Sequence, residues 1–291
     1  MQITALTPTD GPVPDGRATG RTTGLARLLA TPAGGRTRLI RAHSEGQLRV
    51  LRTHWIDQAL PDLATVLLAN PGGGILQSDR LVLEVQTQAG ARLSIQTTSA
   101  ARVYAMRDGA AELHVAFQVA KDAYLEYLPD PLIPYAAARV VSEATHVVHE
   151  DGVLVVGEVV APGRAARGER LRYESVESIL EVRRPDGRLL VRDRLELRPE
   201  EGRLHFGLMG SYEALGTLFV IRKGFDWRGL EAELDTGCDA HGGWSELPSG
   251  AGAWFKVLAR DSGSASTAMR AAWSAARRRL LGACPPPPRR Y

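Results

Sequence analysis

The stretch Arg80–Thr97, RLVLEVQTQAGARLSIQT, decides the fold class. Apolar residues recur at every second position in both of its halves, at Leu81, Leu83 and Val85 and then at Leu93 and Ile95. Successive side chains of a β-strand point to opposite faces, so this alternation is typical of half-buried strands. Gly90 lies between the two halves, and we expect two strands to be joined around it.

The same alternation returns later in the chain, at Leu113–Val119, Val176–Val182 and Leu195–Leu197. A turn signal at Pro185–Gly187 separates the last two runs. No helical pattern alternates with the runs, as a doubly wound parallel sheet would require. The sequence therefore predicts a mainly β core of many antiparallel strands.

One helix is predicted close to the end of the chain. Five apolar residues share one face at helical spacing: Met269, Ala272, Trp273, Ala276 and Leu280. The run Pro285–Pro288 then prevents the helix from continuing. At the other end, residues 1–23 are rich in proline and glycine, which favours a flexible leader. We expect residues 24–291 to form a single domain, because 291 residues with 44% hydrophobic content can bury a large core.

Composition argues against several classes of protein. No apolar run approaches the roughly 18 residues of a membrane span, and no signal peptide is recognisable, so we expect a soluble cytoplasmic chain. The two cysteines, Cys238 and Cys284, are too few for a disulfide framework, and we expect free thiols. The 36 basic and 33 acidic residues are interspersed, which argues against nucleic-acid binding.

Enzymatic motifs are absent as well. The glycine run Asn70–Ile75 lacks the Gly-Lys-Ser/Thr ending of a phosphate loop and reads as a structural turn. Neither a Gly-x-Ser-x-Gly elbow nor a His-Glu-x-x-His motif occurs. His146 and His149 fall in a predicted strand, where residues three apart face opposite sides. Cys238 and His241 supply only two of the four ligands of a structural zinc site.

Several segments occur in a characteristic order. They are Asn70–Leu83 (NPGGGILQSDRLVL), Thr97–Tyr104 (TTSAARVY), Leu128–Tyr135 (LPDPLIPY), Gly163–Glu169 (GRAARGE), Gly242–Pro248 (GGWSELP) and the C-terminal helix with its proline run and Arg289, Arg290 and Tyr291. In this order they resemble the urease accessory protein UreD family, also called UreH, over roughly residues 24–291. Ser78 stands where the family usually has glycine before the aspartate.

The resemblance implies both a fold and a role. The implied fold is mainly β, a two-layered and partly β-helical arrangement with about two α-helices, one of them near the C-terminus. The implied role is that of a non-catalytic factor that binds the accessory protein UreF, which recruits the GTPase UreG. This assembly would dock on the urease structural subunits and help to insert nickel. No cofactor is expected to be tightly bound, and nickel is expected only in transit.

Five residues in the quoted segments are predicted to line a wet internal passage for nickel: Asp79, Asp130 and Glu169 with the hydroxyls of Thr98 and Ser99. Oxygen ligands suit transit, because a few carboxylates bind Ni²⁺ more loosely than several imidazoles or thiolates do. Each of these residues lies at a predicted turn or strand end, from which a side chain can enter the interior.

A structural alternative stays open for two of these carboxylates. Asp79 would then cap the glycine turn, and Glu169 would pair with Arg164 or Arg167, since buried acids are usually paired. Two functional alternatives also remain. One is an adaptor that never touches nickel, and the other is a hydrolase using Asp79, Asp130 or Glu169 as general acid and base.

The C-terminal region is the predicted contact for UreF, because aromatic and arginine residues often anchor interfaces. The candidate contacts are Trp273, Arg277, Arg278, Arg289, Arg290 and Tyr291. The alternative is that the helix covers its own core and that Trp273 packs internally.

Overall fold

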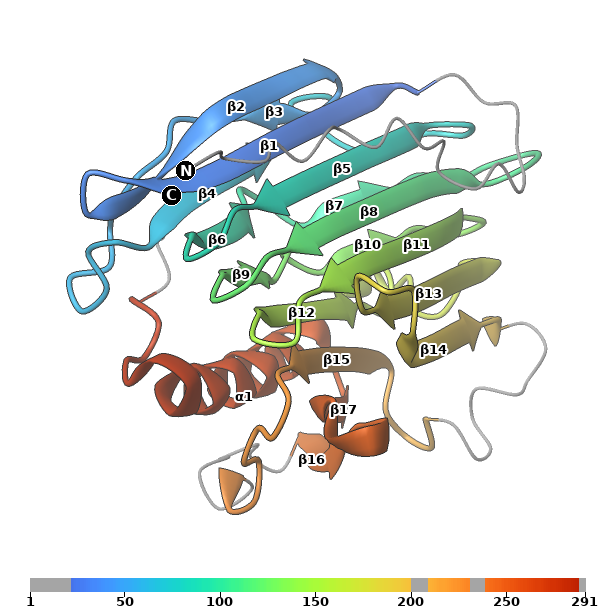
Figure 1. The fold of residues 1–291 in the computed structure, drawn as a ribbon. Helices are drawn as coiled ribbons and strands as arrows, with labels where there is room; N and C mark the ends of the chain where they lie inside the picture. Colours follow the sequence, from blue (N-terminus) through green and yellow to red (C-terminus); the bar gives the residue numbers. More distant parts are fainter. Residues whose placement is uncertain (1–21, 200–208, 231–238, 288–291) are drawn as a thin grey trace.

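A computed structural model describes residues 22–199, 209–230 and 239–287. Two β-sheets lie face to face, and one long helix covers part of the rear sheet (Figure 1). The expected flexible leader at residues 1–23 falls almost wholly outside the described residues, so that expectation stays a prediction. The mainly β, two-layered fold is confirmed.

The front sheet has seven strands. In spatial order they are β14 (Leu189–Leu197), β13 (Ser175–Arg183), β11 (Arg139–Val148), β8 (Ala111–Val119), β5 (Arg80–Thr87), β1 (Gly24–Ala33) and β2 (Arg36–Gly46). The rear sheet has ten strands. Eight of them form a row: β16 (Ala240–Glu246), β17 (Gly252–Ala259), β15 (Ala214–Ile221), β12 (Val153–Val160), β9 (Tyr124–Tyr127), β6 (Arg92–Thr97), β4 (Ala64–Ala69) and β3 (Arg49–Val50). The short strands β7 (Ala101–Val103) and β10 (Leu132–Pro134) pair beside this row.

The middle of the chain winds as a coil between the two sheets. From β4 to β13, apart from the short strands β7 and β10, rear and front strands alternate along the chain. From β5 onward, each of these alternating strands pairs in parallel with the strand one coil earlier. This is the β-helical part of the fold. Antiparallel pairs occur at the ends, where β1 meets β2, β13 meets β14, and β15 and β17 extend the rear sheet from β12.

The expectation of many antiparallel strands is therefore wrong for the coil. Gly90 does lie in the turn between β5 and β6, with a φ of 74°. However, β5 pairs with β1 and β8 in the front sheet, whereas β6 pairs with β4 and β9 in the rear sheet. Alternation shows only that one face of a strand is buried, and it carries no information on strand direction.

Helix α1 (Ser262–Leu281) packs on the outer face of the rear sheet, mainly against β15 and β17. The Asp261 side chain caps its first turn by accepting a hydrogen bond from Ser264 N. Its buried face includes Met269, Ala272 and Trp273, as the spacing predicts. Gly216 lets the helix approach, since a Cβ there would lie 2.7 Å from Met269 Cγ. Only this α-helix occurs among the described residues, where about two were expected. Short 3-10 turns include Ala165–Arg167 and Pro248–Gly250.

Candidate functional site

Four long connections lead from rear strands to front strands, and all four lie on the same side of the coil. They join β4 to β5, β6 to β8, β9 to β11 and β12 to β13, and they contain the first four segments quoted from the sequence. On the opposite side, the chain returns from front to rear through tight turns such as the one at Gly90. These four sequence segments therefore occupy the same position in successive coils.

Direct contacts stack these connections on one another. Ile75 forms a parallel bridge with Val103 of β7, and β7 pairs in parallel with β10. The rings of Tyr104 and Tyr135 are 5.0 Å apart, and the guanidinium of Arg164 lies 4.3 Å from the centre of the Tyr135 ring. The Asn70–Ile75 glycine run is part of this packing, because a Cβ on Gly74 would lie 2.1 Å from Tyr104 Cε2.

A cavity of about 240 Å³ lies between the two sheets, beneath these connections. Inward-facing apolar side chains such as Leu83 of β5, Val115 of β8 and Phe219 of β15 form much of its wall. The inner cavity is therefore largely apolar, with polar groups at particular places on its wall.

Thr98, Ser99 and Asp130 border the inner cavity and also an outer cavity of about 340 Å³. The outer cavity lies between the end of β6 and helix α1, and Arg270, Trp273 and Pro286 form its far wall. Thus three of the five residues predicted to line a passage stand where the two cavities adjoin.

The position of Asp130 at this partition is held by Thr97. The Thr97 hydroxyl donates to Asp130 Oδ2 at 2.8 Å, and the backbone N–H of Asp130 donates to Thr97 Oγ1 at 2.7 Å. Such a reciprocal pair holds the carboxylate in one orientation. The sequence places Thr97 in the right segment but does not single it out.

A second set of polar groups lies on another part of the wall of the inner cavity. Ser178 Oγ donates to Glu158 Oε2 at 3.1 Å, and Lys256 Nζ lies 3.3 Å from Asp193 Oδ1. Glu158, Ser178 and Asp193 all border the cavity. Burial raises the pKa of the Glu158 carboxyl, and the nearby charge of Asp193 raises it further, while the bond from Ser178 acts in the opposite direction. We call Glu158, Ser178, Asp193 and Lys256 the cavity cluster.

His146 of β11 also borders the inner cavity. Its ring stacks on Phe117 with centroids 4.7 Å apart, and its Nδ1 has no hydrogen-bond partner within the described structure. Burial lowers the pKa of His146 to about 3, so the imidazole is neutral near pH 7. His149 follows β11 in a turn, where its Nδ1 accepts a hydrogen bond from Asp151 N. The two histidines therefore do not share a site.

Asp79 and Glu169 occupy different surroundings from Asp130. Asp79 accepts hydrogen bonds from Gln47 Nε2 and Leu76 N, both at 2.7 Å, so it caps the turn before β5. Glu169 accepts from the Arg164 guanidinium and from Ala136 N. The bond from Arg164 holds the pKa of Glu169 below its usual value. Neither carboxylate borders the inner or the outer cavity, and both have the contacts of the structural alternative.

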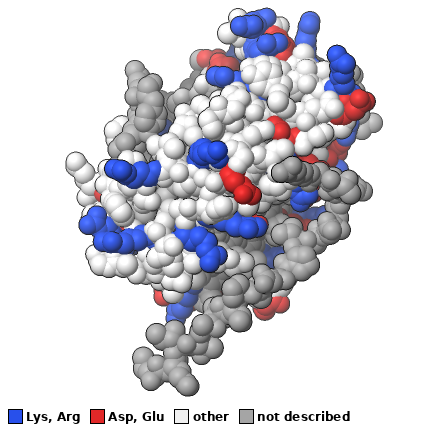
Figure 2. All heavy atoms as spheres, turned by 90° about the horizontal axis from the view of Figure 1, so that it is seen from above, with Lys and Arg blue, Asp and Glu red and all other residues white. Residues whose placement is uncertain are grey.

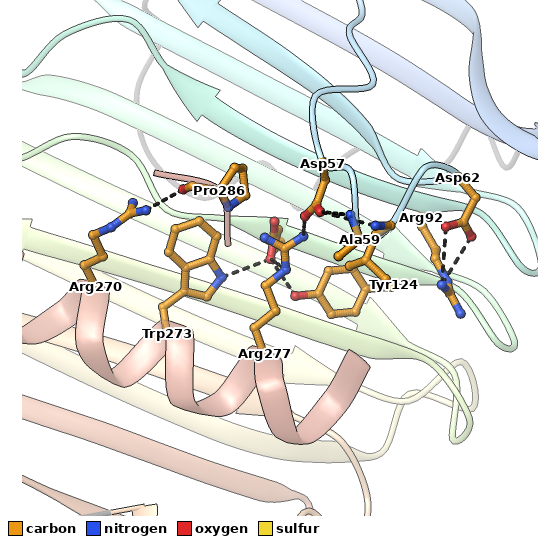
Figure 3. Close-up of polar contacts among 11 residues, drawn as sticks. Asp57, Ala59, Asp62, Arg92, Tyr124, Arg270, Trp273, Arg277 and Pro286 are labelled. Carbon is orange, nitrogen blue, oxygen red and sulfur yellow. Dashed lines mark hydrogen bonds and ion pairs between the residues drawn. The ribbon is translucent and has the colours of Figure 1, made fainter. Parts of the chain in front are cut away.

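Two of the predicted UreF contacts are buried beneath α1 (Figure 3). Arg277 is 1% exposed and pairs with Asp57, and its Nε lies 3.8 Å from Glu126 Oε2. The same Glu126 oxygen accepts from Trp273 Nε1 at 2.9 Å and from the Tyr124 hydroxyl at 2.5 Å. We call these five residues the α1 cluster.

The interface prediction is corrected accordingly for Trp273 and Arg277, because both side chains point into the protein rather than to a partner. For Trp273, this internal packing is the alternative that the helical pattern left open. Arg278 is exposed and remains a candidate contact. Arg289, Arg290 and Tyr291 lie outside the described residues.

The described residues contain no group of three or more His, Cys, Asp or Glu side chains arranged to hold a metal ion. Cys284 is a free, exposed thiol, whereas Cys238 falls in one of the gaps of the description. The walls of the two cavities instead carry a few separate oxygen donors. They include Asp130, where the two cavities adjoin, and Glu158, in the wall of the inner cavity. Such donors bind divalent cations weakly and reversibly.

The sequence contained one overlooked signal for the cavity cluster. Glu158 interrupts the apolar run VLVVGEVV, and a charged residue in a buried strand is unusual unless it has a function or a partner. The pairing of Asp193 with Lys256 had no such signal, because 63 residues separate the two in the chain.

Fold and site together define a class: β-solenoid-like proteins whose long connections gather over an internal cavity with polar groups on its wall. A model of the UreD urease accessory protein family matches residues 22–291. The chain thus belongs to the UreD urease accessory protein family.

Individual relatives agree with this assignment. The chain is 31% identical to urease accessory protein UreD 2 of Streptomyces griseus, in an alignment covering 93% of this chain and 95% of the relative. It is 32% identical to UreD of Natronomonas pharaonis, with 90% and 89% covered. It is 34% identical to UreD of Mycolicibacterium gilvum, with 87% and 93% covered. No helix in the described ranges is long and apolar enough to cross a membrane.

Proposed function

We propose that this chain is a non-catalytic cytoplasmic factor in urease maturation. It binds UreF, which brings the GTPase UreG, and the assembly docks on apo-urease to assist nickel insertion. Membership of the UreD urease accessory protein family supports the role in maturation. The partners follow from the family resemblance, and the exposed Arg278 on α1 is a candidate contact for UreF.

Within this role, we propose that nickel passes through the chain by way of the outer and inner cavities. The observation that carries the proposal is that Thr98, Ser99 and Asp130 border both cavities. An ion entering the outer cavity meets these oxygens first and reaches Glu158 beyond them. Burial raises the pKa of Glu158, and a cation beside this carboxylate would favour its charged form, which supports the proposal.

The passage differs from its predicted composition. Asp130, Thr98 and Ser99 remain its proposed entry, and Glu158 and Asp193, which also border the inner cavity, are added to it. Asp79 and Glu169 instead hold the turns that surround it. Their hydrogen bonds also weaken the hydrolase alternative, which needs carboxylates free to exchange protons in one cleft.

Reconstitution with purified apo-urease, UreF, UreG, nickel and GTP tests the role in maturation. We expect urease activity to depend on this chain, and the chain to co-purify with UreF. Full activation without the chain, or turnover by the chain alone on ester, amide and glycoside substrates, would contradict the proposed role.

A second reconstitution separates the passage from the adaptor alternative. Thr98→Trp places a bulky ring where the two cavities adjoin, and we expect nickel loading to fall while the complex with UreF still assembles. Thr267→Trp is the matched control, because Thr267 lies on the exposed side of α1. Normal loading with Thr98→Trp would leave the adaptor as the better account.

A further inference from the structure

Positive charge is concentrated in one part of the chain that the proposed passage does not use. Residues 31–56 contain five arginines and a single glutamate, whereas the whole chain has 36 basic and 33 acidic residues. The arginines are Arg36, Arg38, Arg41, Arg49 and Arg52, and the glutamate is Glu45. This stretch forms β2, β3 and the segment that follows them.

The register of β2 directs its basic residues to the outer face of the front sheet. Arg36 and Arg38 lie opposite Ala33 and Thr31, while Thr37 and Leu39 between them face inward. The register then shifts, and Ile40 is the additional residue of a β-bulge. Because a bulge inserts one residue, Arg41 again points outward and lies opposite Leu29.

The segment after β3 runs beside the free edge of β2. Val50 N donates to Ser44 Oγ near one end of β2, and Trp55 Nε1 donates to Thr37 O near the other. Thr37 N also donates to Asp62 O, so a second chain is blocked from pairing with the edge at this point. The accessible surface here is consequently the outer face of β2 and the adjoining segment, rather than the edge.

Apolar side chains are exposed among the arginines. Ile40 is 58% exposed, Leu51 41% and Trp55 36%. The guanidinium of Arg36 lies 4.7 Å from the centre of the Trp55 ring. Within the described ranges, no carboxylate pairs with Arg36, Arg38, Arg41 or Arg52. We name these four arginines with Ile40, Leu51 and Trp55 the arginine face. Figure 2 shows the side of the molecule where β2 lies, with basic side chains standing among uncharged ones.

We propose that the arginine face docks an acidic protein surface. Unpaired arginines attract carboxylates and form bidentate pairs with them. The exposed tryptophan, isoleucine and leucine favour a protein over a nucleic acid, because interface centres combine aromatic and aliphatic side chains with arginine. Nothing in this surface overlaps the outer cavity, so the docking is separate from the proposed nickel route.

This inference rests on the proposed function only for the choice of partners in its test. The affinities of the full chain for apo-urease and for UreF are measured separately, at low and moderate salt. The variant is Arg36→Glu/Arg38→Glu/Arg41→Glu, and a second variant carries Gln at the same positions in case charge reversal perturbs folding. The control is Arg107→Glu/Arg167→Glu/Arg188→Glu, an equal change of charge at exposed arginines elsewhere.

We expect both arginine-face variants to weaken binding to one partner at least about tenfold and to reduce the salt dependence of that binding. The control should bind both partners like the unmodified chain. Unchanged binding of both partners by the variants would overturn the proposal, as would an equal loss in the control. Loss confined to a 20-nucleotide RNA or to anionic phospholipid vesicles would also overturn it. If the unmodified chain itself activates no urease, the proposed function fails. This outcome differs from failure of the docking proposal, in which the unmodified chain activates urease but the variants bind both partners normally.

Discussion

The α1 cluster is a buried group of charged side chains, whereas the charged side chains of the cavity cluster are partly exposed, and the two clusters also differ in how their charges are compensated. Beneath α1, Arg277 lies between two carboxylates, Asp57 and Glu126, and none of these three residues borders the inner or the outer cavity. In the cavity cluster, the Ser178 hydroxyl is the only hydrogen-bond partner of the Glu158 side chain among the described residues, and Glu158 borders the inner cavity. The ion pair with Arg277 joins the helix to the sheet, whereas the Glu158 carboxylate borders a cavity.

The largest effect on stability is expected for Arg277→Met. This change leaves Asp57 and Glu126 buried without their cation, and breaking a buried pair in this way costs about 3–5 kcal/mol. Urea unfolding should show a clearly lowered midpoint. The control is Arg279→Met on the same helix, whose exposed pairing with Asp226 should contribute no more than about 1 kcal/mol. Equal stability of the two variants would remove the structural role of the α1 cluster.

Asp79→Ala and Glu169→Ala should come next, with a loss of about 1–3 kcal/mol each, because backbone and side-chain donors lose their acceptor. Thermal unfolding measures this loss. Because Asp79 and Glu169 hold turns, we expect urease activation by these variants to decrease only in proportion to the loss of folded protein. Reduced nickel loading at full thermal stability would return both residues to the passage.

His146 should make the protein sensitive to acid. Its pKa is lowered to about 3 in the folded state, while an unfolded histidine titrates near pH 6.5. The unfolded state then binds more protons between these values, so stability falls as the pH is lowered through this window. His146→Gln should flatten the dependence of the urea midpoint on pH between about 6 and 4. An unchanged slope would show that His146 is not buried in its neutral form.

The smallest effect on stability is expected for Glu158→Gln. The folded-state pKa of Glu158 is raised, so the folded state binds more protons and stability falls as the pH rises above the usual glutamate value. The variant should therefore gain stability relative to the unmodified chain as the pH rises from about 4 to 7. A loss of stability at pH 7 instead would mean that the carboxylate is a structural partner, like those beneath α1.

Much of the fold followed from the sequence, and the failures have identifiable causes. Alternation located β5, β6, β8 and β13, because a half-buried strand must alternate. The strand direction was predicted wrongly, because the parallel partner of each strand lies one coil away in the chain and the local sequence pattern does not depend on it. The four connections were found through their motifs, although their stacking depends on contacts such as that of Tyr104 with Tyr135.

The site was predicted in part. Thr98, Ser99 and Asp130 border both cavities, and turn residues on one side of a coil are accessible to this kind of reasoning. Asp79 and Glu169 look the same in the sequence, but their hydrogen-bond partners are known only once the chain is folded. The sequence pattern predicts that Arg277 lies on the surface, because charged residues of an amphipathic helix usually face solvent. Its buried partner, Asp57, lies 220 residues away in the chain, so no local pattern indicates the pairing.

The central claim is that nickel travels past the carboxylates that border the two cavities. The most direct test is the nickel content of apo-urease matured with Asp130→Asn/Glu158→Gln, measured by elemental analysis beside Glu150→Gln/Asp186→Asn, which changes two carboxylates away from both cavities. We expect several-fold less nickel per urease active site with the cavity variant and normal loading with the control, while both complexes with UreF assemble. Normal loading by a folded, assembled cavity variant would contradict the account.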